Sequence, residues 1–184
     1  MASIAIVYHS GYGHTQRQAQ VIAEAAGGQL IAIDADGNIP EAAWAQLDAA
    51  DAIVFGSPTY MGAASWQFKK FADASSKPWY SRNWKDKIFA GFTNSASTNG
   101  DKGKTLDYFY TLAMQHGGLW VGLGEVASNS KAATRNDLNW IGVFQGAAAT
   151  TPSDASVAEM LPGDLETSRV LGRRVAQVAA KWAR

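Results

Sequence analysis

Apolar residues along the chain alternate between short continuous runs and longer stretches with helical spacing. The runs at residues 4–8, 52–55 and 88–92 contain no polar residue at alternate positions. Such runs are typical of central parallel strands that are covered on both faces. Runs at 30–33 and 119–123 predict two further strands.

The stretches between these runs have the spacing of amphipathic helices. In residues 15–26 the apolar side chains recur at i, i+3, i+4 and i+7, and Gly27 and Gly28 then predict a C-terminal stop. Residues 41–50 and the stretches around Phe68 and Phe109 predict three more helices. A last helix is expected from Pro162, with Asp164 as its N-cap. Its expected apolar stripe is Leu171, Val175, Val178 and Trp182.

Strands that alternate with helices predict an α/β fold, a doubly wound five-stranded parallel sheet with helices on both faces. We expect one domain over residues 1–184, since this length supports one substantial core and is short for two domains. Residues 124–162 are less regular, and 144–150 are a candidate second half of a split fifth strand.

The first strand leads into a loop of small and hydroxyl residues, Ser10-Gly11-Tyr12-Gly13-His14-Thr15, and then directly into a helix. Glycines that tolerate unusual dihedrals and the free N–H groups of a helix start make such a turn an anion site. A structural turn that binds nothing is the simpler alternative.

Three kinds of phosphate loop compete for this stretch. A cysteine phosphatase is excluded because the chain has no Cys, and a nucleoside-triphosphate loop is excluded because the loop has no Lys. A dinucleotide loop fits Gly11, Gly13 and Asp34 but meets Gln16 where its third small residue belongs. A mononucleotide loop, which needs hydroxyl and backbone donors around a terminal phosphate, fits better.

Two more loops of similar composition follow the third and fourth predicted strands, at residues 56–62 and 93–100. In an open parallel sheet, ligands bind beyond the carboxyl ends of the strands, where the strand order reverses. For the order 2-1-3-4-5, the loops after strands one, three and four are neighbours at that edge. Their convergence is a stronger indication of a site than any one loop.

The chain resembles the flavodoxin superfamily and, within it, the tryptophan-repressor-binding-protein family of FMN-dependent NAD(P)H:quinone oxidoreductases. The resemblance rests on the motifs SGYGHT (10–15), SPTYMG (57–62) and TNSASTNG (93–100), runs to about Gly124 and resumes near residues 146–151. Residues 128–145 depart from the family pattern.

The resemblance implies an FMN site and assigns residues to it. The phosphate residues would be Ser10, Gly11, Tyr12, Gly13, His14 and Thr15. One side of the ring would meet Pro58, Thr59, Tyr60, Met61 and Gly62, and the other Thr93, Asn94, Ser95, Ser97 and Gly100. His116 matches a histidine near the flavin in that family and is the candidate catalytic residue.

The implied function is transfer of two electrons from NAD(P)H, as co-substrate, to a quinone or similar small acceptor. The alternatives are a flavodoxin-type electron carrier without NAD(P)H oxidase activity and a dinucleotide-binding dehydrogenase. The resemblance also implies a homodimer or homotetramer.

Charge and composition limit the kinds of molecule that we expect the protein to bind. Sixteen basic residues balance sixteen acidic ones, which gives no argument for nucleic acid. The absence of Cys removes thiolate metal sites and redox thiols, so redox chemistry would belong to a cofactor, and we expect no metal site. No run reaches about 18 apolar residues, and we expect a cytoplasmic protein without membrane insertion.

Two local features have simpler interpretations than a functional one. His9 is interpreted as a structural residue at a strand end, because a lone imidazole is no metal site. The stretch GDKGKT (100–105) imitates the end of a nucleotide P-loop, but position 98 is Thr where that motif requires Gly, and we interpret it as a chance match.

Overall fold

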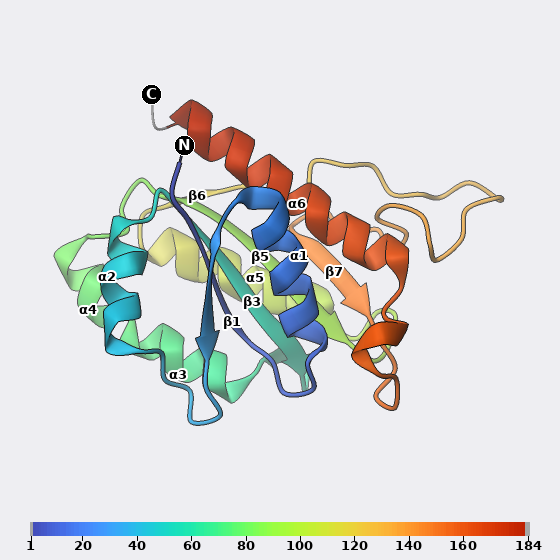
Figure 1. The fold of residues 1–184 in the computed structure, drawn as a ribbon, viewed down its shortest axis with the longest axis horizontal. Helices are drawn as coiled ribbons and strands as arrows, with labels where there is room; N and C mark the ends of the chain where they lie inside the picture. The colour runs from blue at the N-terminus through green and yellow to red at the C-terminus, as the bar shows by residue number, and fades with distance from the viewer. Residues whose placement is uncertain (1, 183–184) are drawn as a thin grey trace.

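The computed structural model describes residues 2–182 and shows a twisted sheet between two layers of helices (Figure 1). The strands are β1 (Ile4–His9), β2 (Gln29–Ile33), β3 (Ala52–Tyr60), β4 (Ala63–Ala64), β5 (Ile88–Ser95), β6 (Leu119–Trp120) and β7 (Ala147–Thr150). The helices are α1 (His14–Ala26), α2 (Glu41–Ala49), α3 (Trp66–Ala74), α4 (Ser76–Ser81), α5 (Lys102–Gln115) and α6 (Pro162–Trp182), with a 3₁₀ turn η1 (Val157–Glu159).

The parallel strands follow the order β2-β1-β3-β5-β6, which confirms the predicted doubly wound sheet. The fifth position of the sheet is divided between two short strands. β6 pairs with the start of β5, from Ile88, and β7 pairs with its end, up to Ser95. The prediction of a split fifth strand is therefore confirmed, although β7 begins at Ala147 instead of residue 144.

Each face of the sheet has its own hydrophobic core. On one face α1 and α6 pack against β1, β3 and β5, with Ile22 and Leu171 fully buried. On the other face α2, α3 and α5 cover the sheet, and Phe55, Phe68 and Phe109 form the centre of an aromatic cluster. Burial at about 25 cal/mol per Å² of apolar surface drives both layers together.

β3 and β5 are longer than the sequence predicts, because residues 56–60 and 93–95 are strand and not loop. The two strands stay in parallel register through Ser57–Thr93 and Pro58–Asn94. β3 then turns back into β4 through Met61 and Gly62, which both have positive φ, as a type I′ hairpin turn requires. Small residues indicated a loop, but pairing with a distant strand decided the conformation.

The last helix begins at Pro162, so the prediction that Asp164 is its N-cap is wrong. Asp164 lies in the first turn and is buried, where one carboxylate oxygen accepts a hydrogen bond from the amide of Thr150 at 2.8 Å. The same oxygen lies 3.7 Å from the guanidinium of Arg135. Trp182, expected in the apolar stripe, is largely exposed and donates to the carbonyl of Asp86 instead.

Between β6 and β7 the chain runs through residues 121–146 without a helix or strand and extends away from the sheet, at the right of Figure 1. Asn139 ties this segment to α6, because its amide donates to the hydroxyl of Thr167 at 2.9 Å. Arg135 lies 5.5 Å above the ring of Trp140, within range of a cation–π contact. None of the described helices is long and apolar enough to cross a membrane.

His116 follows α5 and is buried in the aromatic core. Its ring lies 4.3 Å from that of Trp84, and its Nε2 lies 3.0 Å from Ser75 Oγ. The Ser75 hydroxyl donates its proton to the carbonyl of Ala72, so Nε2–H donates to Ser75. Within the described residues Nδ1 has no partner, and burial lowers the pKa of His116 to about 4.

We predict that His116 makes part of the protein's stability depend on pH. The unfolded chain takes up a proton near pH 6.5 and the folded chain does so only near pH 4. The contribution is thus complete above pH 6.5 and is lost as the pH falls toward 4, by about 3 kcal/mol in all. Urea unfolding at pH 7 and at pH 4 measures how much free energy of unfolding each protein loses between the two pH values. This loss should be about 3 kcal/mol smaller for His116→Gln than for wild type.

The carboxylates titrate in both proteins, so the difference between the two losses isolates the imidazole. Equal losses in wild type and variant would contradict this account of His116.

Candidate functional site

The carboxyl ends of β1, β3, β5 and β7 meet at the lower edge of the sheet in Figure 1 and enclose a cavity of about 150 Å³. Its lining residues come from the three loops that composition singled out and from the segment after β7. They are Tyr12, His14, Thr15, Pro58, Thr59, Tyr60, Asn94, Ser95, Ala96, Thr151 and Ser153. The site lies where the sheet reverses its strand order.

The first loop presents the uncapped start of α1 to this cavity. Gly13 is the N-cap, with φ +88°, and no side chain caps the helix. Its amide donates to Ser10 Oγ at 3.1 Å, and the first helical hydrogen bond runs from Arg17 to Gly13. Among the described residues the amides of His14, Thr15 and Gln16 have no acceptor, and the first turn holds no acid. This is an electrically positive group of donors aimed at one point.

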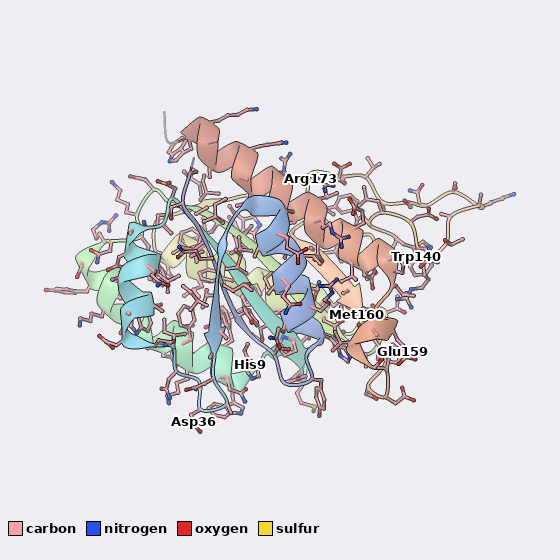
Figure 2. All side chains as sticks on the ribbon, in the orientation of Figure 1. His9, Asp36, Trp140, Glu159, Met160 and Arg173 are labelled. Atoms are coloured by element: carbon pink, nitrogen blue, oxygen red, sulfur yellow. The ribbon has the colours of Figure 1, made fainter. Side chains whose placement is uncertain are left out.

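A buried hydrogen-bond network fixes the second loop. Ser57 Oγ accepts from the amide of Ser65, and the Ser65 hydroxyl lies 2.9 Å from Nδ1 of His9. Ser65 also caps α3 by accepting from Phe68. His9, labelled in Figure 2, therefore contacts the second loop through Ser65 and does not line the cavity. This agrees with its interpretation as a structural residue.

Hydroxyl groups also connect the second and third loops across the floor of the cavity. Thr59 Oγ1 lies 2.8 Å from Thr93 Oγ1 and 2.8 Å from Thr105 Oγ1. On the far side, Thr151 donates to the side-chain oxygen of Asn94 at 2.9 Å. These contacts join β3, β5, α5 and the segment after β7 into one rigid frame.

Several predicted site residues lie at the rim of the cavity. Tyr12 is exposed and meets Tyr60 edge to face at 6.3 Å. Gly11 lies beneath the Tyr60 hydroxyl, where a Cβ would approach within 2.5 Å. The hairpin turn carries Met61, fully exposed, and Gly62.

In the third loop Ser97 is exposed, and Gly100 adopts φ +50° against the side chain of Ser95.

The structure does not bring His116 to this cavity. α5 starts beside Ser95, at the carboxyl end of β5, and runs back along the sheet. His116 follows its last turn, just before β6 pairs with Ile88 at the amino end of β5. The candidate catalytic histidine is therefore buried at the opposite edge of the sheet.

Sequence reasoning missed four residues that line or support the site. Thr151 and Ser153 line the cavity, and Ala155 accepts a hydrogen bond from Nε2 of His14 at 2.9 Å. A signal was present, because TTPS (150–153) follows an apolar run of small residues as the other loops do. Lys102 was also missed; it is buried under the third loop.

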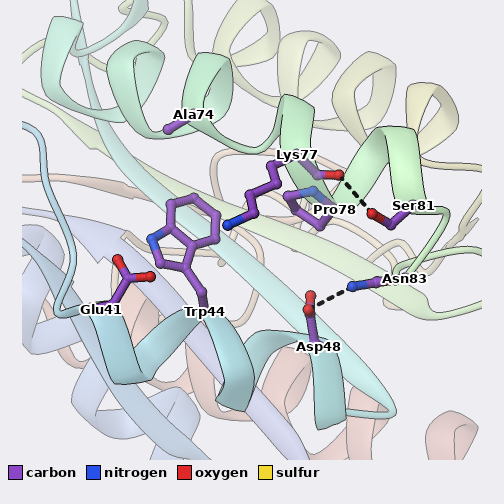
Figure 3. A pocket seen from close by; sticks show the side chains of 8 residues that line it. All are labelled: Glu41, Trp44, Asp48, Ala74, Lys77, Pro78, Ser81 and Asn83. Atoms are coloured by element: carbon purple, nitrogen blue, oxygen red, sulfur yellow. Dashed lines mark hydrogen bonds between the residues drawn. The ribbon is translucent and has the colours of Figure 1, made fainter.

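A separate cleft of about 250 Å³ lies between α2 and α4, far from these loops (Figure 3). Glu41, Asp48 and Lys77 surround the indole of Trp44 there. Asp48 is already engaged, since it accepts from Asn83 and from the indole N–H of Trp84. Its lining includes no predicted site residue, and its charged groups of both signs converge on no common point.

The carboxyl-edge cavity can do two things chemically. The free amides of α1 can hold an anion, and the hydroxyls and backbone of the second and third loops can bond the edges of a flat polar ring between them. Within the described residues no cluster of His, Asp and Glu could hold a metal ion.

Comparisons with known proteins agree with this geometry. A flavodoxin domain matches residues 5–152. The chain is 54% identical over 178 residues to "Flavodoxin FldP" from Pseudomonas aeruginosa, with 97% of each chain covered. It is 30% identical over 209 residues to an "NAD(P)H dehydrogenase (quinone)" from Archaeoglobus fulgidus, covering 98% of this chain and 99% of that protein.

A solved structure described as a flavodoxin, WrbA-like protein from Agrobacterium tumefaciens is also similar. It shares 54% sequence identity and a TM-score of 0.83, and the match covers 98% of this chain and 99% of that one. The resemblance expected from the three loop motifs is thus confirmed, and the chain belongs to the flavodoxin superfamily, in its WrbA-like group.

Proposed function

We propose that the carboxyl-edge cavity binds FMN and that the protein transfers two electrons from NAD(P)H to a quinone or similar small acceptor. The observation that carries the flavin site is the convergence of uncapped amides from α1 with hydroxyl and backbone groups of two flanking loops. A terminal phosphate and a flat heterocycle are the two chemical parts that such a site accommodates.

The phosphate fits the start of α1. A dianion there would be met by the free amides of His14, Thr15 and Gln16, by the hydroxyls of Ser10 and Thr15, and by the positive end of the helix dipole. No Asp or Glu lies in this loop or in the first turn of α1 to oppose it. Thr15 is buried, so its hydroxyl has little competition from water.

The ring fits between the second and third loops. Pro58 to Gly62 would lie along one side of it, and Thr93 to Gly100 along the other. FMN, when bound, supplies the hydride acceptor. The chain's part is to orient the ring and to bond its polar edge through backbone groups, while Tyr12 and Tyr60 limit the access of water.

The rim of the cavity favours an enzyme. The chain exposes Met61 and Trp66 there, together with Lys69 and Lys70, and Lys69 forms an ion pair with Asp73. A rim that is apolar and has no excess of negative charge does not oppose an anionic dinucleotide and admits a flat quinone. Relatives of about 30% identity named as NAD(P)H dehydrogenases (quinone) support this use of the site.

A flavodoxin-type electron carrier is the second candidate, and it is favoured by the name of the relative at 54% identity. A carrier would use the same flavin site and would lack NAD(P)H oxidation. Assembly into dimers or tetramers stays a prediction in either case.

We predict that Thr15→Val weakens FMN binding by roughly one to two orders of magnitude, because a lost hydrogen bond to a charged group is worth about 1.5–3 kcal/mol. Riboflavin, which has the ring without the phosphate, should bind wild type and variant equally. Titrations that follow flavin fluorescence measure both affinities.

Thr111→Val is the matched control, since Thr111 is an exposed helix residue on α5 whose hydroxyl donates to the carbonyl of Asp107. It should leave both affinities unchanged. If Thr15→Val bound FMN as wild type does, the start of α1 would not be the phosphate site.

A second prediction separates enzyme from carrier. Anaerobic stopped-flow mixing of the FMN-loaded protein with NADH or NADPH should bleach the flavin absorbance within seconds, and a benzoquinone should restore it. Steady turnover of NAD(P)H with the quinone should follow. Flavin absorbance that persists for minutes with both nicotinamides, in a protein that binds FMN, would establish the carrier and exclude the enzyme.

A further inference from the structure

The third loop rests on a buried lysine. Lys102 begins α5, its side chain is 1% exposed, and its ammonium group points back under the loop. Nζ donates to the hydroxyl of Ser95 at 2.6 Å, to the carbonyl of Ser97 at 2.5 Å and to that of Thr98 at 3.2 Å. An ammonium group has three N–H donors, so all of them have acceptors in this loop.

These contacts determine which way the loop's peptide groups face. In a trans peptide the C=O and the following N–H point in opposite directions. Because the carbonyls of Ser97 and Thr98 point inward to Lys102, the amides of Thr98 and Asn99 point outward. Among residues 2–182 neither amide finds an acceptor.

Thr98, Asn99 and Lys102 line a hollow shared with residues 141–145, whereas Ser95 lines the carboxyl-edge cavity. Lys102 therefore acts on that cavity through Ser95 and through the backbone that it fixes.

The backbone after the loop is strained in support of this arrangement. Gly100 and Asp101 have φ of +50° and +52°, and the second is costly for a residue with a side chain. This turn directs the first residue of α5 inward.

The charge of Lys102 is not neutralised where it lies. No carboxylate of the described residues is within 4 Å of Nζ; Asp164 on α6 attracts it from a distance, and Arg135 in the segment 121–146 repels it. A buried cation without an adjacent counter-charge depends on its three acceptors in the loop, so its charge and the conformation of the loop are coupled.

We propose that Lys102 is a positioning residue for the flavin ring: by holding the Ser95 hydroxyl and the carbonyls of Ser97 and Thr98, it keeps the third loop in the conformation that bonds the ring. This inference rests on the proposed flavin site. It predicts an effect on the ring and none on the phosphate.

The test compares Lys102→Met with Lys104→Met. Methionine keeps an unbranched apolar stem and removes the ammonium group, and Lys104 is the matched control, a largely exposed lysine on the same helix. We expect Lys102→Met to weaken riboflavin and FMN by the same factor, about tenfold or more. Lys104→Met should bind both as wild type does. Thr15→Val, in contrast, should affect FMN alone.

A pH titration of riboflavin binding tests the same inference in the wild-type protein, so the main result does not depend on whether Lys102→Met folds. Burial lowers the pKa of Lys102 to about 8; Asp164 opposes this shift and Arg135 adds to it. Above pH 8 the neutral amine has two N–H donors for three acceptors, so the loop loosens. Riboflavin affinity of wild type and Lys104→Met should fall by up to about tenfold from pH 7 to pH 9, and that of folded Lys102→Met should stay constant.

Two results would overturn the role of Lys102 without affecting the proposed flavin site. One is a riboflavin affinity of wild type that stays constant over this pH range. The other is an equal riboflavin affinity in folded Lys102→Met and wild type. Wild-type protein that binds no FMN at any pH overturns the proposed function itself, and the inference with it.

Discussion

The pairing of β3 with β5 beyond the apolar core is the constraint on which the rest of the site depends. The ladder continues from Phe55–Gly91 through Gly56–Phe92 to Pro58–Asn94. The close fit at Gly56 makes this possible, because a Cβ there would lie 2.1 Å from an atom of the Phe92 ring. β3 has a glycine, Gly56, at the point where the Phe92 ring of β5 packs against it. Both strands therefore reach the carboxyl edge in register, and their hydroxyl-bearing ends face each other.

That register explains how side chains from separate strands contact one another at this edge of the sheet. Thr59 and Thr93 contact each other because their strands are paired, and Thr105 joins them because α5 packs against β5. These three hydroxyls satisfy one another, which leaves backbone groups of the loops for a ligand. The support extends to β7, where Thr151 holds Asn94 and the carboxylate of Asp164 holds the amide of Thr150. The cavity is a property of the sheet edge as a whole.

The sequence predicts those features that depend on local pattern. The strand order, the helices other than α4 and the place of the site at the carboxyl edge follow from apolar runs, helical spacing and composition. Ser57 to Tyr60 could not be recognised as strand, since Gly, Ser and Pro favour loops and the pairing that overrides them is non-local. Lys102 was hidden for a similar reason: a lysine beside two glycines is expected in solvent, and its acceptors are carbonyls that only the folded loop gathers. His116 is different, because topology alone could have excluded it. A helix that follows a parallel strand ends at the opposite edge from the loop that starts it.

Proteins named as flavodoxins and as quinone dehydrogenases match this chain over nearly its whole length, so the shared cavity does not separate the two functions. The difference must lie in what surrounds the cavity. Here the β3–β4 turn holds Met61 fully exposed in a conformation that side chains rarely adopt, and Trp66 stands exposed on the next helix. The hairpin turn requires this backbone conformation, but the exposed Met61 side chain adds nothing to the hydrophobic core. It does give a small planar molecule an apolar surface at the entrance, next to Lys70 and to Lys69, which is paired with Asp73. The rim therefore suits a small planar molecule better than a highly charged protein partner.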